Sequence, residues 1–247
     1  MELFDLIVIG GGPGGYLAAE RAGHAGLKVA LFEKRALGGV CLNWGCIPSK
    51  ALLYSAKVFD YANHATAYGV TVKGATIDQS AVIDRKDAVV KALVSGVGAA
   101  MKKNQITVVN AVAVIKGKNA GGFEVEAAGK VYTGKKLVIA AGSEAVVPPI
   151  PGAKEGLAAG YVLTNREILA LRKIPKALAI IGGGVIGLEM ASYFCSVGSK
   201  VTVIEMLNKI AGPTDVEIST ILQKNYAKKG VDFKLGCKVT GFDKGSV

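Results

Sequence analysis

Histidine, tryptophan and cysteine are scarce in this chain of 247 residues, which contains two, one and four of them. His24 and His64 are isolated and no CxxC pair occurs, so the residue pattern predicts no metal site. No apolar run reaches the roughly 18 residues of a membrane-spanning helix. The N-terminus lacks the basic segment of a signal peptide. These absences favour the cytoplasm, where a cysteine pair is more often catalytic or metal-binding than structural.

The charge balance is strongly positive, with 30 basic and 19 acidic residues and a formal net charge of +11. Lysines on solvated helix faces explain such a balance without a specific role. Binding of nucleic acid is not favoured, because no basic helix and no alternation of basic and aromatic residues occurs. The positive charge suits anionic dinucleotides, which is a weak argument by itself.

The chain repeats itself. Residues 6–34 align without a gap to residues 178–206, at a constant offset of 172. Each copy contains an apolar strand, a glycine turn, an amphipathic helix and a second apolar strand that ends in glutamate. Such a pattern indicates parallel sheets covered by helices. We predict an α/β protein with two Rossmann-like domains, residues 1–147 and 148–247, with a proline-rich junction at 148–151.

The segments outside the repeat predict further elements. Helices are expected at residues 47–62, 81–103, 164–171 and 215–229. Strands are expected at residues 106–115, 122–127, 131–133, 137–141 and 231–235, some of them in a small antiparallel meander. The second domain is expected to be incomplete, because a doubly wound sheet normally contains more strands.

Each copy carries a glycine fingerprint followed by an acidic residue. The glycines are Gly10, Gly12 and Gly15 in the first copy and Gly182, Gly184 and Gly187 in the second. They permit a tight turn, close approach of a pyrophosphate and close packing of the helix. Glu33 and Glu205 follow the third glycine by 18 residues, where a carboxylate binds ribose hydroxyls. Glu205 favours NAD over NADP, although Lys209 nearby argues the other way.

Cys41 and Cys46 form the second informative pattern. In an unbroken helix their Cα atoms would lie about 8.6 Å apart, whereas a disulfide needs less than about 7 Å. The pair can close only if the helix start is distorted, which Gly38, Gly39 and Gly45 make plausible. Two ordinary buried thiols remain the alternative from spacing alone. Cys195 and Cys237 are isolated and are expected to be structural.

Four segments together resemble the pyridine nucleotide–disulfide oxidoreductases. They are GGGPGGYLAAERA at 10–22, GGVCLNWGCIPSKALL at 38–53, LVIAAGS at 137–143 and GGGVIGLEMA at 182–191. The similarity covers essentially the whole chain and is greatest to the members that oxidise dihydrolipoamide.

The resemblance implies FAD in the first site and NAD in the second. The implied FAD contacts are Gly10, Gly12, Gly15, Glu33, Lys34, Gly38, Gly39, Val40, Cys41, Lys50, Ala113, Ala141, Gly142 and Ser143. The implied NAD contacts are Gly182, Gly184, Val185, Ile186, Gly187, Glu205 and Val239. Cys41 would exchange with dihydrolipoamide and Cys46 would face the flavin. Lys50 would pair with Glu189 near the contact between flavin and nicotinamide; their ordinary interpretations are a solvated lysine and a helix-dipole acid.

The sequence departs from this family in three ways. Trp44 replaces a small or aliphatic residue, and Ala141 stands where threonine is commoner. Family members are also about twice as long, and their C-terminal dimerisation domain supplies an acid–base histidine to the other subunit. The resemblance therefore predicts the N-terminal portion of a homodimeric enzyme, with impaired turnover and weakened FAD binding.

Three functions follow from these observations. The first is oxidation of dihydrolipoamide carried by the lipoyl domain of a 2-oxo acid dehydrogenase or glycine cleavage complex. The second is an NADPH-dependent disulfide reductase of the same family, which Glu205 disfavours. The third is a non-catalytic nucleotide-binding fragment.

Overall fold

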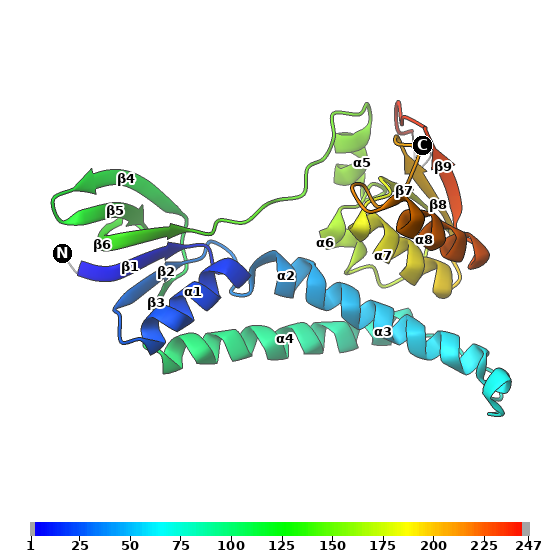
Figure 1. Ribbon diagram of the computed structural model, residues 1–247, viewed down its shortest axis with the longest axis horizontal. Coiled ribbons are helices and arrows are strands. Elements are labelled where there is room, and N and C mark those ends of the chain that lie inside the picture. The colour runs from blue at the N-terminus through cyan, green and yellow to red at the C-terminus, as the bar shows by residue number, and fades with distance from the viewer. Residues whose placement is uncertain (1–2, 244–247) are drawn as a thin grey trace. The chain divides into compact units, whose positions relative to one another are not determined.

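The computed structural model describes residues 3–243 and divides the chain into two compact units. The first comprises residues 1–48 and 87–144, and the second comprises residues 49–86 and 145–247. Each unit contains one copy of the repeat, built as parallel strands with helices (Figure 1). This confirms the predicted α/β class, whereas the domain boundary after residue 147 stays a prediction.

The first unit contains a six-stranded sheet in the order β3-β2-β1-β6-β5-β4. The strands are β1 (Leu3–Ile9), β2 (Val29–Phe32), β3 (Thr107–Val109), β4 (Ala113–Asn119), β5 (Gly122–Ala127) and β6 (Lys130–Ile139). Strands β3, β2, β1 and β6 are parallel, and β6, β5 and β4 form an antiparallel meander. Val8 lies opposite Leu31 on one side and Val138 on the other, so β1 is paired along both edges.

The two faces of this sheet bury different side chains, as the alternation of a strand requires. On one face Val8 and Leu31 pack with residues of α1 (Pro13–His24) and the C-terminal half of α4 (Gln79–Lys103). On the other face Ile7 and Phe32 pack with Val125 of the meander. The core of the first unit therefore lies on both sides of β1 and β2, directly below the glycine turn.

Two strand predictions in this unit are wrong. Residues 106–115 are not one strand: β3 ends at Val109, whose carbonyl accepts from Glu33 and Ala111, and β4 begins at Ala113. Residues 131–133 and 137–141 are not two strands, because β6 runs unbroken from Lys130 to Ile139. Its first half pairs with β5 and its second half with β1. The polar residues at 135–136 obscure that continuity in the sequence.

The second unit contains a parallel sheet in the order β7-β8-β9. These strands are β7 (Ala177–Ile181), β8 (Lys200–Glu205) and β9 (Asp232–Leu235). The helices that belong to it wholly or mainly are α3 (Cys46–Asn63), α5 (Ala153–Ala159), α6 (Asn165–Ile168), α7 (Val185–Ser196) and α8 (Val216–Lys228). Helix α6 is shorter than expected, with Thr164 and Glu167 forming a capping box at its start. The sequence did not predict α5 or the 3₁₀ helix Ala65–Tyr68.

The core of the second unit is centred on α7. Tyr193 and Phe194 are fully buried and pack with Val203 of β8 and Leu52 of α3. The Tyr193 hydroxyl donates to Oε1 of Gln79 at 2.6 Å, which satisfies a buried polar group. This bond joins α7 to the first turn of α4.

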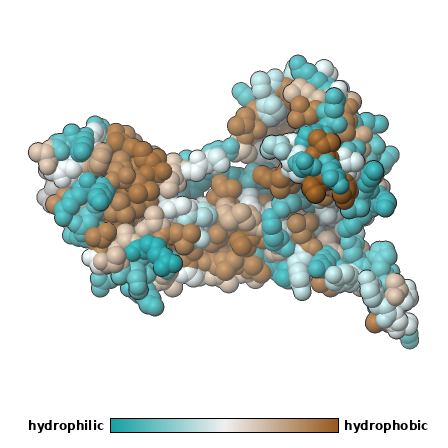
Figure 2. Space-filling model, in the orientation of Figure 1, coloured by the Kyte–Doolittle hydropathy of each residue, from teal (hydrophilic) through white to brown (hydrophobic). Residues whose placement is uncertain are grey.

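Apolar side chains are also exposed on the first unit. Val112, Val114 and Ile139 lie where β4 begins and β6 ends, and Ile139 is 66% exposed. Figure 2 shows hydrophobic residues gathered in this region. Among residues 3–243, no helix is both long enough and apolar enough to cross a membrane.

Candidate active site: two glycine turns and a disulfide

The first glycine turn joins β1 to α1. Gly10 has φ +106°, a backbone conformation that suits glycine, and a Cβ there would overlap the Ala140 carbonyl of the neighbouring chain segment. A Cβ on Gly15 would overlap the Gly10 carbonyl oxygen. Gly12 is the N-cap of α1 and provides no side-chain cap. Pro13 has no N–H and the Gly15 N–H donates to the Gly12 carbonyl, so an anion at this helix start would meet the N–H groups of Gly12 and Gly14.

Glu33 closes this turn from the end of β2. Its Oε2 accepts from the Gly11 N–H at 2.7 Å, and its Oε1 accepts from the Arg35 N–H at 2.7 Å. Each carboxylate oxygen retains a further acceptor position. Glu33 can thus shape the turn and accept a hydrogen bond from a ribose hydroxyl.

A pocket of about 330 Å³ opens beside the turn, within the range of small-molecule sites. The predicted FAD contacts in its wall are Gly10, Gly12, Glu33, Lys34, Gly39, Val40, Cys41, Ala141, Gly142 and Ser143. Pro13, Gly14, Arg35, Trp44, Ala140 and Glu144 complete the wall. Of the other predicted contacts in this unit, Gly15 and Gly38 lie outside the lining, and Ala113 packs against the sheet core instead.

Glu144 pairs with two other residues of the pocket wall, Lys34 and Arg35. Its carboxylate lies 3.1 Å from Lys34 Nζ and 2.8 Å from Arg35 Nη1. The hydrogen bond from Arg35, followed by that from Lys34, holds the pKa of Glu144 below the usual glutamate value. The two cations that follow Glu33 therefore share one carboxylate from a residue more than 100 positions away in sequence.

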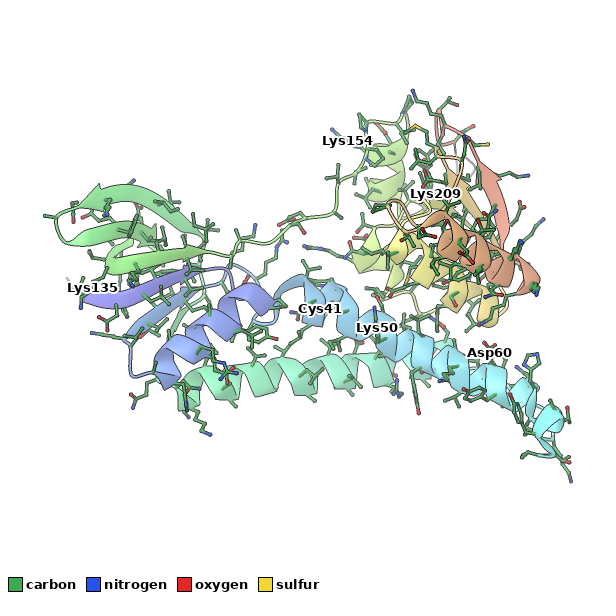
Figure 3. The ribbon with its side chains drawn as sticks, viewed as in Figure 1. Cys41, Lys50, Asp60, Lys135, Lys154 and Lys209 are labelled. Atoms are coloured by element: carbon green, nitrogen blue, oxygen red, sulfur yellow. A yellow bond between two sulfur atoms is a disulfide. The ribbon has the colours of Figure 1, made fainter. Side chains whose placement is uncertain are left out.

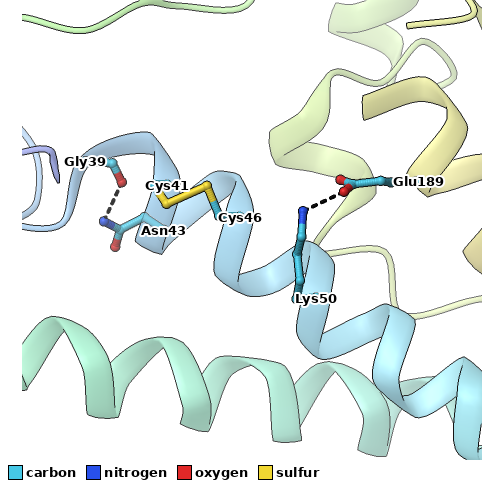
Figure 4. The surroundings of a disulfide bond; sticks show 6 residues. All are labelled: Gly39, Cys41, Asn43, Cys46, Lys50 and Glu189. Carbon is cyan, nitrogen blue, oxygen red and sulfur yellow. Dashed lines mark hydrogen bonds and ion pairs between the residues drawn. A yellow bond between two sulfur atoms is a disulfide. The ribbon is translucent and has the colours of Figure 1, made fainter. Parts of the chain in front are cut away.

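The cysteine pair lies at a break between two helices. Helix α2 (Gly39–Trp44) ends at Gly45, and α3 begins at Cys46. Cys41 and Cys46 form a disulfide across this break, with their Cα atoms 4.7 Å apart (Figure 4). The expectation that closure needs a distorted helix start is confirmed. Cys41 lines the pocket, whereas Cys46 is exposed to solvent.

Asn43, between the two cysteines, has a role that the motif analysis missed. Its side-chain nitrogen donates to the Leu37 carbonyl at 3.0 Å and to the Gly39 carbonyl at 2.8 Å. The N–H of Gly38 donates to the Gly11 carbonyl at 2.8 Å. These bonds connect the disulfide-bearing helix to the first glycine turn.

The second glycine turn repeats the backbone bonding of the first. Gly183 N–H donates to Glu205 Oε2 at 2.7 Å, and Leu207 N–H donates to Oε1 at 2.8 Å. Gly184 is the N-cap of α7 and, like Gly12, provides no side-chain cap. Val185 and Ile186, the next two residues, are exposed. The second unit thus offers an uncapped helix start and an oriented carboxylate, as the sequence predicts for a dinucleotide site.

The segment after Glu205 is tied into a compact loop. Ala211 N–H donates to the Gly183 carbonyl at 2.8 Å, and Ala211 adopts φ +62°. The Lys209 ammonium donates to the carbonyls of Gly212 and Thr214. Val239 lies half-buried beyond β9, and its contact with NAD stays a prediction.

Lys50 and Glu189 come together although 139 positions separate them. Lys50 Nζ lies 2.5 Å from Glu189 Oε1, on α3 and α7 of the second unit (Figures 3 and 4). The Lys50 side chain is 62% exposed and the Glu189 side chain is 20% exposed. The ion pair is present, and its role beside a flavin stays a prediction.

The remaining cysteines take no part in this arrangement. Cys195 donates to the Lys229 carbonyl, and burial raises the pKa of its thiol. Cys237 is an exposed thiol just after β9. A raised pKa disfavours the reactive thiolate, so Cys195 is poorly suited to exchange chemistry.

A fold with paired dinucleotide turns and a disulfide beside one of them defines a class of redox protein. The model of the pyridine nucleotide-disulphide oxidoreductase family matches residues 4–247, and the chain belongs to that family.

Similar proteins identify the branch more closely. The chain is 45% identical over 241 residues to dihydrolipoyl dehydrogenase of Acholeplasma laidlawii, covering 97% of this chain and 70% of that one. It is 40% identical over 246 residues to dihydrolipoyl dehydrogenase of Chlamydia muridarum, covering 98% and 51%. Among solved structures, the flavoprotein disulfide reductase RclA of Escherichia coli, in its Cu(II) complex, matches with a TM-score of 0.80 and 30% identity, covering 96% and 50%. The chain thus spans about half the length of several relatives that it matches.

Proposed function

We propose that the protein is a flavoprotein disulfide oxidoreductase that oxidises dihydrolipoamide to lipoamide and passes two electrons to NAD⁺. The observation that carries this proposal is the position of Cys41. It belongs to a disulfide and lines the same pocket as Gly10, Gly12 and Glu33. The similarity to dihydrolipoyl dehydrogenases of two bacteria supports this substrate over other dithiols.

The residues of the first pocket fit the nucleotide half of FAD. A Cβ on Gly39 would meet the Gly12 Cα at 2.6 Å, so no side chain fits between these two residues. Because both are glycines, no side chain covers the turn and a diphosphate can approach its backbone. The N–H groups of Gly12 and Gly14 at the start of α1 would hold the phosphates, and Glu33 would accept from the ribose. When bound, FAD supplies a carrier that takes two electrons from the reduced cysteine pair and delivers them to NAD⁺.

The cysteine pair performs the thiol step in a balanced exchange. A thiolate of dihydrolipoamide attacks Cys41 Sγ, and Cys46 leaves as a thiolate. The second substrate thiol then attacks the mixed disulfide and releases Cys41 as a thiol. Lipoamide gains one S–S bond, the Cys41–Cys46 bond is lost, and two electrons pass from the substrate to the pair.

The loop after Glu205 supports NAD rather than NADP as the second cofactor. Glu205 is oriented by two backbone N–H groups, and a carboxylate in that position binds a 2′-hydroxyl and repels a 2′-phosphate. Lys209, the residue that argued for NADP, uses its ammonium on the Gly212 and Thr214 carbonyls. That cation is therefore not free to neutralise a 2′-phosphate, which weakens the alternative of an NADPH-dependent reductase.

The acid–base group for the substrate thiols is proposed to come from a partner subunit of a homodimer. His24 and His64 do not line the pocket, and His64 Nδ1 lies 2.7 Å from the Asp60 carbonyl.

The chain's only tryptophan provides a direct test, because Trp44 lines the same pocket as Cys41. Titration with FAD should quench its fluorescence, and dithiothreitol should then bleach the visible absorbance of the bound FAD. Cys41→Ser and Cys46→Ser should retain FAD and lose the bleaching at low dithiol. Cys195→Ser changes a cysteine that does not line the pocket; it is the matched control and should behave as the parent.

Two outcomes would contradict the proposal. A protein that shows no FAD-dependent quenching at high FAD would favour the non-catalytic alternative. Bleaching that survives in both serine variants would show that the disulfide does not carry the electrons.

A further inference from the structure

Helix α2 is too short to be stable by itself, and it carries one of the two reactive sulfurs. It contains six residues, Gly39–Trp44, and its N-cap is Gly38, which provides no side-chain bond. Isolated helices shorter than about 12 residues are marginal in water. Something outside the helix ladder must therefore hold Cys41 at the distance that the disulfide requires.

Asn43 supplies that restraint. Its partly buried amide donates to the Gly39 carbonyl within α2 and to the Leu37 carbonyl before the helix. A single side chain thus ties the first turn of α2 to the segment that leads into it; Figure 4 shows its bond to Gly39. Gly38, between these two acceptors, is bonded through its N–H to the Gly11 carbonyl of the glycine turn.

We propose that Asn43 is a positioning residue for the Cys41–Cys46 pair, and that it sets the equilibrium between disulfide and dithiol. The proposal rests on the proposed function, because it assigns a role within the same redox site. With both bonds in place, α2 keeps its position when the disulfide is reduced, so Cys41 stays near Cys46. Without them the dithiol form gains conformational freedom, and re-forming the S–S bond becomes less favourable.

Three substitutions separate the two hydrogen bonds from the size of the side chain. Asn43→Asp keeps the shape and replaces the NH₂ group, which provides both donors, by one carboxylate oxygen that faces two carbonyls. Asn43→Ala removes the group. Asn43→Ser retains one donor on a shorter side chain, so its effect should be intermediate.

A matched control exists in the same unit. Asn104 also donates its amide to the carbonyl four residues earlier, Ala100, at 2.9 Å. It lies beyond the end of α4 and lines no part of the pocket. Asn104→Asp thus removes a comparable bond without touching the segment between the cysteines.

The experiment equilibrates the full chain with defined ratios of reduced and oxidised dithiothreitol, traps the thiols and counts them by mass spectrometry. No flavin is added. Asn43→Asp and Asn43→Ala should lower the equilibrium constant for closing the disulfide by about three- to tenfold. A tenfold change corresponds to about 30 mV for this two-electron couple. Asn104→Asp should change it less than about twofold, and circular dichroism confirms that each variant is folded.

The two proposals can fail separately. If the parent chain forms no reversible Cys41–Cys46 disulfide, the proposed function fails. If it forms one and the Asn43→Asp and Asn43→Ala constants equal that of the parent, the role of Asn43 is refuted while the function stands. An equal shift in Asn104→Asp would also refute it, because the effect would then follow general destabilisation.

Discussion

The first glycine turn bonds Glu33 to the N–H groups of Gly11 and Arg35, and the second bonds Glu205 to those of Gly183 and Leu207 in the same way. In each turn the carbonyl of the middle glycine also accepts from a residue with positive φ. The Gly11 carbonyl accepts from Gly38, and the Gly183 carbonyl accepts from Ala211. The repeat therefore extends beyond the aligned segments. The gapless offset would pair Gly38 with Ile210, so one extra residue precedes the equivalent bond in the second copy.

The surroundings of the two turns differ. Gly10 packs against the Ala140 carbonyl, because β1 has the parallel strand β6 beside it. Gly182 has φ +97°, yet among residues 3–243 no atom lies within 4 Å of where its Cβ would be. In the part of the chain that the structure describes, β7 ends its sheet. Gly10 is thus required by both its packing and its backbone conformation, whereas Gly182 is required by its backbone conformation alone.

The largest effect should come from Gly10→Ala. The new methyl group would overlap a backbone oxygen, so we expect a loss of more than about 3 kcal/mol in the unfolding free energy of the first unit. Gly182→Ala should cost about 1–2 kcal/mol, the strain of a left-handed alanine. Urea unfolding followed by Trp44 fluorescence reports the first unit, and circular dichroism reports both.

Gly26→Ala is the control for Gly10→Ala. Gly26 has φ +81° with open space around it, so its variant carries backbone strain without overlap. If Gly10→Ala costs no more than Gly26→Ala, packing against Ala140 is not what distinguishes the two turns.

The next effect should separate the cofactors. Glu33→Gln should weaken FAD binding about 10- to 100-fold and leave NADH binding nearly unchanged, because a hydrogen bond to a charged group contributes about 1.5–3 kcal/mol. Glu205→Gln should do the reverse and narrow the preference for NADH over NADPH. Calorimetric titration of each nucleotide measures both variants. A loss of both nucleotides in either variant would mean that the two sites are not independent.

A smaller effect concerns the stability of the second unit and its dependence on alkaline pH. Burial raises the pKa of Tyr193 to about 12, so the folded state favours the neutral phenol. The contribution of this raised pKa to the free energy of unfolding is complete below the ordinary tyrosine pKa near 10 and is lost as the pH rises towards 12. Tyr193→Phe should cost about 1–3 kcal/mol at neutral pH, because Gln79 loses a buried partner, and should flatten this alkaline decline.

The aligned position in the first copy provides the comparison for Tyr193. Arg21 occupies it and is exposed, so Arg21→Ala should leave the alkaline limb unchanged. Denaturant unfolding at several pH values measures both variants. If the loss of stability at alkaline pH is the same in Tyr193→Phe as in the parent, another group causes it, such as Tyr226, whose pKa is also raised by burial.

The smallest effect should come from exchanging the two positive-φ residues. Gly38→Ala brings a methyl group 2.7 Å from Leu42 Cβ and should destabilise the first unit by at least the roughly 1–2 kcal/mol of a left-handed alanine. Ala211→Gly relieves backbone strain and removes a buried methyl, so its net change should stay within about 1 kcal/mol. Thermal unfolding of both variants tests the exchange. If Ala211→Gly lowered the unfolding free energy as much as Gly38→Ala does, glycine would not be favoured at both positions, and the two positions would not be equivalent.

Much of the site could be predicted from local sequence. The glycine spacing and the strand-end acids predict both turns, because their bonds join residues 22 positions apart within one strand–helix–strand unit. The three glycines around the cysteines predict the helix break that allows Cys41 and Cys46 to meet. The pairing of Lys50 with Glu189 was anticipated only through the family resemblance, since nothing in the spacing connects them.

Other features had no local signal. Glu144 pairs with Lys34 and Arg35 only because β6 lies beside β1, which brings the two chain segments together. The misread strands have the same origin: β6 is continuous because it pairs with β5 and then with β1, a non-local choice. Asn43 could be suspected from its place between two cysteines, but its acceptors are backbone carbonyls that the motif does not specify.

By itself the sequence determined the two dinucleotide turns, their acidic residues and a cysteine pair able to close, because each depends on glycine and residues nearby in the chain. Tertiary structure decided what surrounds them. It placed Cys41 in the pocket of the first turn, paired both Lys34 and Arg35 with the Glu144 carboxylate, and engaged Lys209 away from Glu205. Such contacts depend on which strands and loops become neighbours, and that is settled by packing over the whole unit rather than by local pattern.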